Sequence, residues 1–436
     1  MESLRQGLRD HLRPRAPGVT QRTSLPRHCP RYLVLTGGDL VATGAGDEYW
    51  AEPNLPSTFK HELLTRYVPM FTGMTGSRAQ GHRVVFLDGY AGRGRYGNGS
   101  AGSPERIMQM AEHQHRTVGL TCASYFVEQD PTSANDLAGV VAEYTRRGVP
   151  AHVRDTNVDS VLEEVLTSAH GHPLFLFLDP TGYGLPYQRL VDILAGPRSS
   201  IWPPTELLLN FSLEAVRRTG GHVSSPQGNE NSMRRLDDAV GGDWWREVFR
   251  SHGVTDDAVR HVSEGFARRL STATGMHVIS VPVRRAPGHK PLYHLVFGTR
   301  SQHGLWLFGD SVARAMQKWW DTLERIDSAF DPDALFTVTE AIRPDLATVE
   351  NRAVPVIAEQ LAGLLDQVPS FTTVNHTLAV FGDFYGQVRD STVRTAVKRL
   401  YDASRTSCDG KRVKPHQLVV TRPRLHRASA HPRQVS

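Results

Sequence analysis

The sequence has very little cysteine: Cys29, Cys122 and Cys408 are the only ones among its 436 residues. They lie far apart and lack the spacing of zinc ligands, so we expect neither a metal site nor a disulfide framework. No apolar run approaches the roughly 20 residues that a membrane-spanning helix needs. The first residues are rich in arginine and lack the apolar core of a signal peptide. We therefore expect a reduced, cytoplasmic protein that makes no use of a membrane.

Charge of one sign does not dominate the whole chain, but it is unevenly distributed. The chain has 50 Lys and Arg residues against 45 Asp and Glu, a formal net charge of +5. Arginine is frequent in residues 1–33, and the stretch from Arg389 to the end is also mostly basic. Two basic ends around a balanced centre predict a polyanionic partner such as nucleic acid. The alternative is a pair of solvated arginine-rich tails.

Short apolar runs alternate with segments of helical periodicity in the first half of the chain. Strands are predicted at Arg83–Asp88, Ala123–Glu128, Ala151–Asp155, Pro173–Asp179 and Glu206–Phe211. Helices are predicted at Lys60–Phe71, Ser103–His113, Thr132–Arg147, Asp159–Ala169 and Tyr187–Leu194. Near-continuous apolar strands joined by helices indicate a parallel sheet that is covered on both faces. The carboxyl ends of its strands then share one edge, where such sheets bind ligands.

The sheet is predicted to end in an antiparallel hairpin. Two apolar runs, His277–Arg284 and Leu292–Gly298, flank a short turn that contains Pro287 and Gly288. Class I methyltransferases have a sheet that ends this way, whereas dinucleotide-binding sheets usually stay parallel. We therefore predict an α/β fold with a Rossmann-like class I methyltransferase sheet and a terminal hairpin.

Four segments follow from this reading of the chain. Residues 1–46 form a basic and largely irregular extension, with a short strand expected at Tyr32–Thr36. Residues 47–330 form the methyltransferase-like domain, with an insertion at about residues 213–275. Residues 350–425 resemble a winged helix, because helices are predicted at Val354–Gln367, Thr372–Phe381 and Asp390–Ala403 and a strand at Gln417–Thr421. Residues 426–436 are a tail.

Cations in two places are candidates for contacts with nucleic acid. Arg394, Lys398 and Arg399 lie on the polar side of the expected recognition helix, where they could contact phosphates or groove edges. Arg217 follows the fifth strand and could contact a substrate phosphate. The alternatives are a winged helix that binds another protein and a surface helix with exposed arginines.

A glycine-rich stretch, FLDGYAGRGRYGNGSAGSP, spans residues 86–104. Asp88 ends the first strand, and Gly92 and Gly94 would let the backbone adopt positive φ and approach a ligand closely. Ser103 is expected to cap the next helix, with Pro104 in its first turn. The stretch is unlike a P-loop, because no Gly-Lys-Ser/Thr follows. The alternative is a plain strand-to-helix turn.

Acidic residues end the next three strands as well. Glu128 could accept hydrogen bonds from ribose hydroxyls, and Asp155 could accept one from an adenine amino group, with its neighbour Asn157 as an alternative. Asp179 begins the sequence DPTGYG, at the place where amino-methyltransferases position a target amine. There, Pro180 would offer its carbonyl and Tyr183 its aromatic ring, one position later than usual. The alternative for each carboxylate is a cap or a solvated side chain.

These stretches together resemble the three-Cys-motif partner family (TcmP). The matching pieces are KHELLTRY at residues 60–67, the glycine-rich stretch at 86–104, FVEQD at 126–130, FLFLDPTGYGLP at 175–186, LLLNFS at 207–212 and GGDWW at 241–245. The resemblance implies a class I fold that uses S-adenosylmethionine. It also implies a separate three-cysteine protein as a partner. The chain departs from the family's aspartate-proline-phenylalanine-glycine pattern at Thr181.

The resemblance also assigns roles to individual residues. It implies that the loop residues Asp88, Tyr90, Ala91, Gly92 and Gly94 flank the amino-acid part of the cofactor. Glu128 would hold the ribose, Asp155 the adenine, and Asp179 would face the methyl acceptor. Lys60 would lie on a leading helix over the cofactor pocket.

Three functions are compatible with these residues. The first is an S-adenosylmethionine-dependent methyltransferase that acts on a base nitrogen of nucleic acid. The second is a binding or partner protein that has the methyltransferase fold without the activity. The third is a nuclease that holds a divalent metal between Asp179, Glu128 and Asp155, although these carboxylates come from separate strands with cofactor-like spacing.

Overall fold

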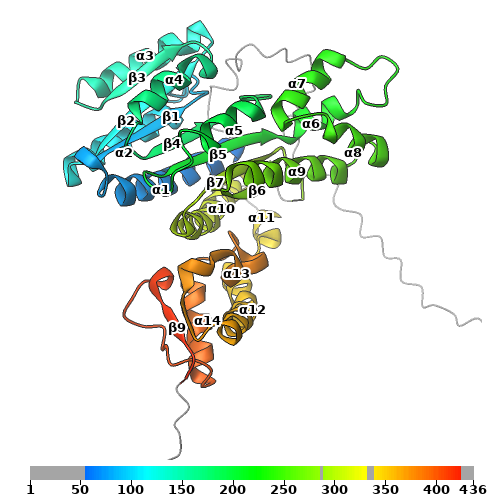
Figure 1. The fold of residues 1–436 in the computed structure, drawn as a ribbon. Helices are drawn as coiled ribbons and strands as arrows, with labels where there is room; N and C mark the ends of the chain where they lie inside the picture. The colour runs from blue at the N-terminus through cyan, green and yellow to red at the C-terminus, as the bar shows by residue number, and fades with distance from the viewer. Residues whose placement is uncertain (1–54, 285–287, 331–337, 424–436) are drawn as a thin grey trace, which may run out of the picture. The chain divides into compact units, whose positions relative to one another are not determined.

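The computed structural model describes residues 55–284, 288–330 and 338–423 (Figure 1). The expected strand Tyr32–Thr36, the basic extension at residues 1–46 and the tail at residues 426–436 lie outside the described residues. Within the described part, no helix combines the length and the apolar character that crossing a membrane requires.

A seven-stranded sheet forms the centre of an α/β architecture that is Rossmann-like in general kind. Its strands are β1 Arg83–Asp88, β2 Thr121–Glu128, β3 Ala151–Asp155, β4 Leu174–Leu178, β5 Thr205–Ser212, β6 His277–Val283 and β7 Tyr293–Thr299, in the order β3-β2-β1-β4-β5-β7-β6. Strands β1 to β5 are parallel, and β7 is antiparallel to both β5 and β6. All seven predicted strands are present, with ends within two residues of the prediction.

The strands at the centre of the sheet are buried on both faces. In β1, Val84 and Phe86 contribute to one apolar cluster, whereas Val85 and Leu87 contribute to another. Successive side chains of a strand point to opposite faces, so an uninterrupted apolar run feeds two cores at once. The same reasoning accounts for LFLFL in β4, where every residue is buried.

Helices cover both faces of the sheet (Figure 1). One core is built by α1 Leu55–Gly76, α2 Ser103–Val118, α3 Pro131–Thr145 and α10 Gln302–Phe330. The other is built by α4 Val158–Ser168, α5 Tyr187–Ala195, α6 Leu213–Gly220, α7 Glu230–Val240, α8 Trp244–His252 and α9 Asp256–Thr274. The expected insertion thus consists of helices that belong to the second core, and Trp245 and Phe249 are fully buried within it.

The start of α2 differs from the prediction. Gly102 occupies the N-cap position, and no side chain caps this helix. Ser103 is the first helical residue, and its hydroxyl donates a hydrogen bond of 2.7 Å to Asp88 Oδ2. The serine therefore connects the helix to the end of β1 instead of capping it.

The C-terminal part has an apolar core of its own, which includes Ile357, Leu361, Val397 and Val420. Its elements are α11 Val338–Ile342, α12 Leu346–Gln367, β8 Ser370–Thr372, the 3₁₀ helices η2 Thr373–His376, η3 Gly382–Phe384 and η4 Pro415–Gln417, α13 Thr377–Phe381, α14 Ser391–Asp402 and β9 Val419–Thr421. Strands β8 and β9 pair antiparallel.

Three predictions for this part need correction. The helix predicted at Thr372–Phe381 is the end of a strand, a 3₁₀ turn and the five-residue α13. The strand predicted at Gln417–Thr421 begins only at Val419. The helix predicted at Asp390–Ala403 begins at Ser391 and ends at Asp402, and the Asp390 carboxylate accepts a hydrogen bond of 3.4 Å from Trp306 Nε1.

Candidate functional site

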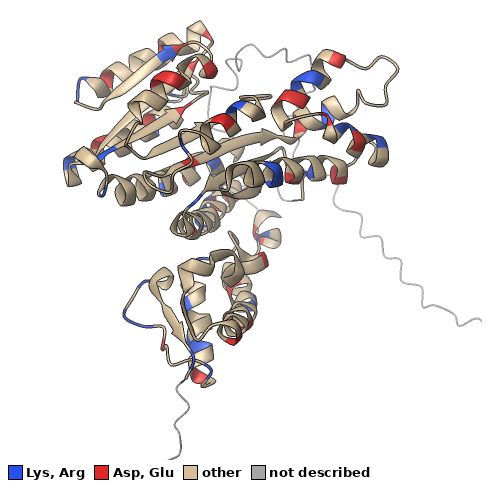
Figure 2. Ribbon diagram, viewed as in Figure 1, with Lys and Arg blue, Asp and Glu red and all other residues tan. Residues whose placement is uncertain are grey.

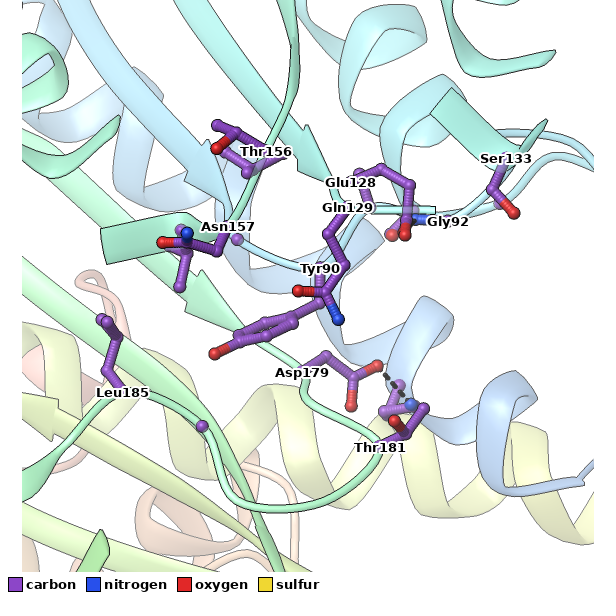
Figure 3. Close-up of a pocket in the computed structure, with 18 of the residues that line it drawn as sticks. Tyr90, Gly92, Glu128, Gln129, Ser133, Thr156, Asn157, Asp179, Thr181 and Leu185 are labelled. Carbon is purple, nitrogen blue, oxygen red and sulfur yellow. Dashed lines mark hydrogen bonds and ion pairs between the residues drawn. The ribbon is translucent and has the colours of Figure 1, made fainter. Parts of the chain in front are cut away.

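A cavity of about 350 Å³ lies at the carboxyl ends of the parallel strands. Its wall consists of the loops that follow β1, β2, β3 and β4, together with the first turns of α1. Strands β2 and β3 lie on one side of β1, and β4 and β5 lie on its other side. The order of the strands therefore reverses direction between β1 and β4. The cavity thus lies at the crevice where open α/β sheets bind ligands. Figure 3 shows the labelled side chains that surround it.

The loop after β1 forms one wall and is tied to β2. Ala91 N donates to Val127 O over 2.8 Å, and Gly92 N donates to Glu128 Oε2 over the same distance. Gly92 and Gly94 have φ values of 63° and 79°, which confirms the expectation of positive φ at both glycines. Tyr90, Ala91 and Gly92 line the cavity, whereas Gly94 lies outside the lining and accepts a hydrogen bond from Gly102 N.

Asp88 lies behind this wall and does not line the cavity. Its side chain is completely buried and accepts hydrogen bonds from Tyr90 N and Ser103 Oγ. Burial raises its pKa to about 7, although the two hydrogen bonds oppose the change. Asp88 therefore lies outside the lining, where it holds the loop and the start of α2.

Glu128 lines the cavity at the end of β2, as predicted. Its carboxylate accepts hydrogen bonds of 2.8 Å from the backbone N–H groups of Gly92 and Asp130, which fix its orientation. Each carboxylate oxygen has two lone pairs, so acceptor capacity remains for a ligand. Asp155 ends β3 but is exposed and outside the lining; Thr156, Asn157 and Asp159 line the cavity in its place.

Asp179 lines the cavity just beyond β4 and has two partners from the chain itself. Lys60 Nζ forms an ion pair with Asp179 Oδ2, and Asn210 Nδ2 donates to Oδ1 over 2.7 Å. The side chains of Lys60 and Asp179 are only 10% and 19% exposed. Lys60 comes from α1 and Asn210 from β5, so three elements meet at this carboxylate. Asn210 was not among the predicted site residues.

The segment after Asp179 is held in a fixed conformation. The Tyr183 hydroxyl lies 2.9 Å from Ala215 O and 2.5 Å from Thr219 Oγ1, which ties the ring to α6. Burial raises the pKa of Tyr183 to about 12. Thr181 and Tyr183 line the cavity, whereas Pro180 is buried outside the lining.

His61 is a second cavity residue that sequence reasoning missed. It lies next to Lys60 on α1 and packs edge-on against Tyr96, with ring centroids 5.9 Å apart. Burial, followed by the charges of Arg106 and Lys60, lowers its pKa to about 3, so the imidazole is neutral. Within the described residues, its buried Nδ1 has no hydrogen-bond partner.

The cations predicted to contact nucleic acid have different surroundings. Arg217 pairs with Asp256 at 2.8 Å, and Lys398 pairs with Asp402 at 2.6 Å. Arg394 donates to the carbonyl groups of Gly410 and Val413, so it holds the loop between α14 and β9. Arg399 is exposed.

The loop held by Arg394 carries cations of its own. Figure 2 shows positive charge along this loop, where Lys411, Arg412 and Lys414 are exposed. Arg412 has a φ of 73°, which is uncommon for a residue with a side chain.

The described residues contain no group of three or more His, Cys, Asp or Glu side chains that could hold a metal ion. Comparison of the whole chain with protein-family models and with curated proteins found no match.

Proposed function

We propose that the chain is an S-adenosylmethionine-dependent methyltransferase of the class I type, with the cofactor in the cavity of about 350 Å³. The observation that carries this proposal is the placement of two of the cavity's carboxylates, Glu128 and Asp179. Glu128 lies beside Gly92, and Asp179 lies apart from them at the far side of Tyr90 (Figure 3). This arrangement suits a ligand whose ribose lies at Glu128 and whose reactive group lies near Asp179.

The chemistry of the lining supports this ligand. S-adenosylmethionine has a positively charged sulfonium and ammonium group, a ribose diol and an adenine. Glu128 can accept from the diol, and the Asn157 amide can pair with the adenine edge. The buried His61 Nδ1 adds a polar atom at the cavity wall. The volume lies within the range of about 300–1,000 Å³ that is usual for small-molecule sites.

The chain's own residues would bind and orient the reactants. The cofactor supplies an activated methyl group when bound. The loop at residues 89–92 excludes water from one side of the cavity, and Glu128 fixes the sugar. Asp179, held by Lys60 and Asn210, faces the position of the acceptor. Positioning of the two reactants accounts for much of the rate in such transfers.

We also propose that the C-terminal part is winged-helix-like and binds nucleic acid. Its order of helices and the β8–β9 pair are compatible with that fold. The exposed cations of the loop between α14 and β9 would contact phosphates, as a wing does. In this proposal the C-terminal part delivers a nucleic-acid acceptor to the cavity.

A second candidate is a non-catalytic partner protein that binds the cofactor. It is favoured by one observation: both oxygens of Asp179 already accept from donors of the chain, namely Lys60 and Asn210. Membership of the three-Cys-motif partner family, with a three-cysteine protein as the partner, would suit this candidate and the first one alike.

Calorimetric titration of the full chain with S-adenosylmethionine tests the cofactor. We expect binding in the micromolar range, which Glu128→Ala weakens at least tenfold because the ribose acceptor is lost. Asp155→Ala is the matched control, since Asp155 is an exposed strand-end carboxylate outside the lining. NAD⁺ as a second titrant separates this site from a dinucleotide site. Absence of S-adenosylmethionine binding by the intact chain would refute the proposal.

A further inference from the structure

In the part of the cavity where the methyl acceptor would bind, the cation Lys60 lies next to the carboxylate of Asp179. Lys60 Nζ contacts Asp179 Oδ2, while Asn210 Nδ2 occupies Oδ1. The same Asn210 nitrogen lies 3.5 Å from the carbonyl oxygen of Pro180. Both oxygens of Asp179 and the Pro180 carbonyl oxygen thus already have a donor of the chain close to them, and Asn210 Oδ1, which has no partner within the described residues, is itself buried.

This arrangement disfavours a nitrogen acceptor. An amine held for methylation donates its N–H groups to two acceptors and keeps its lone pair for the methyl carbon. Here its hydrogens would compete with Lys60 and Asn210 for Asp179. The nitrogen also gains positive charge as it takes the methyl group, beside the ammonium of Lys60, and like charges at short range in a partly buried site repel strongly.

The ring that would stack on a flipped base is also fixed. The Tyr183 hydroxyl is bound on the α6 side by Ala215 O and Thr219 Oγ1. The ring packs against the apolar core on that side of the sheet. The ring still lines the cavity, but these contacts fix its position, so it cannot move to follow a flipped base.

We propose that the methyl acceptor is a hydroxyl oxygen, with Asp179 as the base and Lys60 as the cation that stabilises the oxygen. This inference rests on the methyltransferase function proposed above. A hydroxyl has one proton to lose and therefore needs only one lone pair of Asp179 beyond those that accept from Lys60 and Asn210, whereas an amine needs two acceptors. Negative charge develops on the oxygen as that proton leaves, and a neighbouring positive charge stabilises it.

The transfer balances in atoms and electrons. The acceptor O–H bond breaks and its proton passes to Asp179. The oxygen uses a lone pair to form the bond to the methyl carbon that the sulfonium donor supplies. The carbon–sulfur bond breaks with its electron pair kept by sulfur, which becomes a neutral thioether, and Asp179 later returns the proton to water.

A hydroxyl acceptor defines the class of nucleic acid. Within a polynucleotide chain, the ribose 2′-hydroxyl is the hydroxyl that each nucleotide offers, and DNA lacks it. The base-nitrogen acceptor expected from the sequence is thereby replaced by a ribose oxygen. The proposed substrate is RNA, and its product is a 2′-O-methylated ribose.

Methyl-labelled S-adenosylmethionine and the full chain test this proposal on total RNA and genomic DNA from the source organism after disruption of the gene. A 2′-O-methyl group blocks alkaline cleavage, so we expect label in RNA that alkali releases as dinucleotides. Label in DNA, or in mononucleotides from RNA, would overturn the oxygen acceptor but keep the methyltransferase. Unlabelled RNA despite cofactor binding by calorimetry would also overturn it. Absence of cofactor binding would refute the proposed function itself.

Lys60→Met tests the role of the cation. We expect methyl transfer to fall about 10²- to 10⁴-fold, the range for a positioned catalytic group, while the Kd for S-adenosylmethionine changes less than about threefold. Lys60→Arg keeps the charge and should retain more transfer than Lys60→Met at an unchanged melting temperature. The matched control is Lys290→Met, which removes a lysine paired with Asp256 at 2.8 Å on the surface. Loss of cofactor binding in Lys60→Met would assign Lys60 to the cofactor and overturn its role at the acceptor.

Discussion

The Ser103 hydroxyl donates a hydrogen bond of 2.7 Å to Asp88 Oδ2, and this bond joins the first turn of α2 to the end of β1. The other oxygen of Asp88 accepts from Tyr90 N, which starts the cavity loop. A carboxyl group with no exposed surface thus organises the glycine-rich stretch without contacting the cavity. Because this carboxyl group is buried, the stability of the fold depends on whether it is protonated.

Asp88→Asn should change how stability depends on pH. Burial raises the pKa of Asp88 from 3.8 to about 7, so the native state binds more protons than the unfolded state between these values. Stability from this group is present below about pH 4 and is lost as pH rises towards 7, by up to about 4 kcal/mol. The amide is neutral throughout, and the Ser103 hydroxyl can rotate to accept from it. Urea unfolding from pH 4 to pH 8 should therefore show a growing advantage of the variant.

Asp155→Asn is the control for this measurement. Asp155 also ends a parallel strand, but its side chain is exposed. Its replacement should leave the slope of stability against pH as in the wild type. Equal slopes for wild type and Asp88→Asn would contradict the buried, protonated state of Asp88.

Asn210→Leu separates positioning of Asp179 from stability. The variant loses a hydrogen bond to a carboxylate but also removes Asn210 Oδ1, which is buried and has no partner within the described residues. These effects are each about 1–3 kcal/mol and of opposite sign, so the free energy of unfolding should change by no more than about 2 kcal/mol. Methyl transfer should fall at least tenfold, with the effect in kcat, because Asp179 loses one of its two anchors.

Asn210→Asp is the contrasting variant. It places a second carboxylate against Asp179 at the present contact distance of 2.7 Å. Repulsion between the two charges should lower the melting temperature at pH 8, and protonation should restore it as pH falls. If the melting temperature of Asn210→Asp does not rise when the pH is lowered from 8, the Asn210–Asp179 contact is absent in solution.

The strands of the sheet could be predicted because their sequences are almost uninterrupted apolar runs. A parallel strand in the interior is buried on both faces. The apolar runs in RVVFLD and LFLFL therefore indicate buried strands without reference to the rest of the chain. The position of the cavity then follows, since parallel strands place their carboxyl ends at one edge.

The 29-residue helix α10 was missed, although its sequence carries a signal. Phe308, Val312, Ala315 and Trp319 recur at helical spacing and are buried against α1 and the sheet. The helix follows the hairpin that ends the sheet, and apolar residues at helical spacing continue beyond that hairpin as far as Leu323.

The sequence predicts which residues lie at the ends of the strands, but it does not predict which side chains contact one another in the site. Glu128 and Asp179 were found because each directly follows an apolar strand. The Lys60–Asp179 pair joins residues 119 positions apart, and it exists because α1 packs against the sheet. Asp155 was placed in the site, whereas its neighbours Thr156 and Asn157 line the cavity, because a turn after a strand redirects each successive side chain.

Tyr67→Phe should destabilise the helix that carries Lys60. The Tyr67 hydroxyl donates to Glu206 Oε2 over 2.6 Å, and Thr299 Oγ1 donates to Oε1 over 2.7 Å. Burial raises the pKa of Glu206 to about 7, and the bond from Tyr67 opposes that rise. Loss of this bond should cost about 1–3 kcal/mol in the free energy of unfolding. The loss should be greater at pH 8 than at pH 5, because the ionised carboxylate needs the donor most.

Tyr401→Phe serves as the control, since Tyr401 is 45% exposed. Chemical unfolding of both variants at the two pH values measures the difference. A Tyr67→Phe variant as stable as Tyr401→Phe at pH 8 would argue against a buried Tyr67–Glu206 bond.

Neutralising the loop between α14 and β9 should weaken binding of RNA through electrostatics alone. Lys411, Arg412 and Lys414 are exposed, and a triple replacement by glutamine removes three positive charges from this loop. Each lost phosphate contact should lower the slope of log K against log salt by about 0.7 for single strands. A fluorescence titration from 50 to 300 mM KCl should therefore show a slope smaller by about 2, at an unchanged melting temperature.

Arg394→Met distinguishes a contact with RNA from support of the loop. Arg394 donates to the carbonyl groups of Gly410 and Val413, and so its loss should lower the melting temperature of the C-terminal part. Those carbonyls lose their partners, while the three loop cations remain. The slope of log K against log salt should therefore differ less from the wild-type slope than the slope of the triple variant does. A fall in the salt slope with no loss of stability would instead mean that Arg394 itself contacts phosphate.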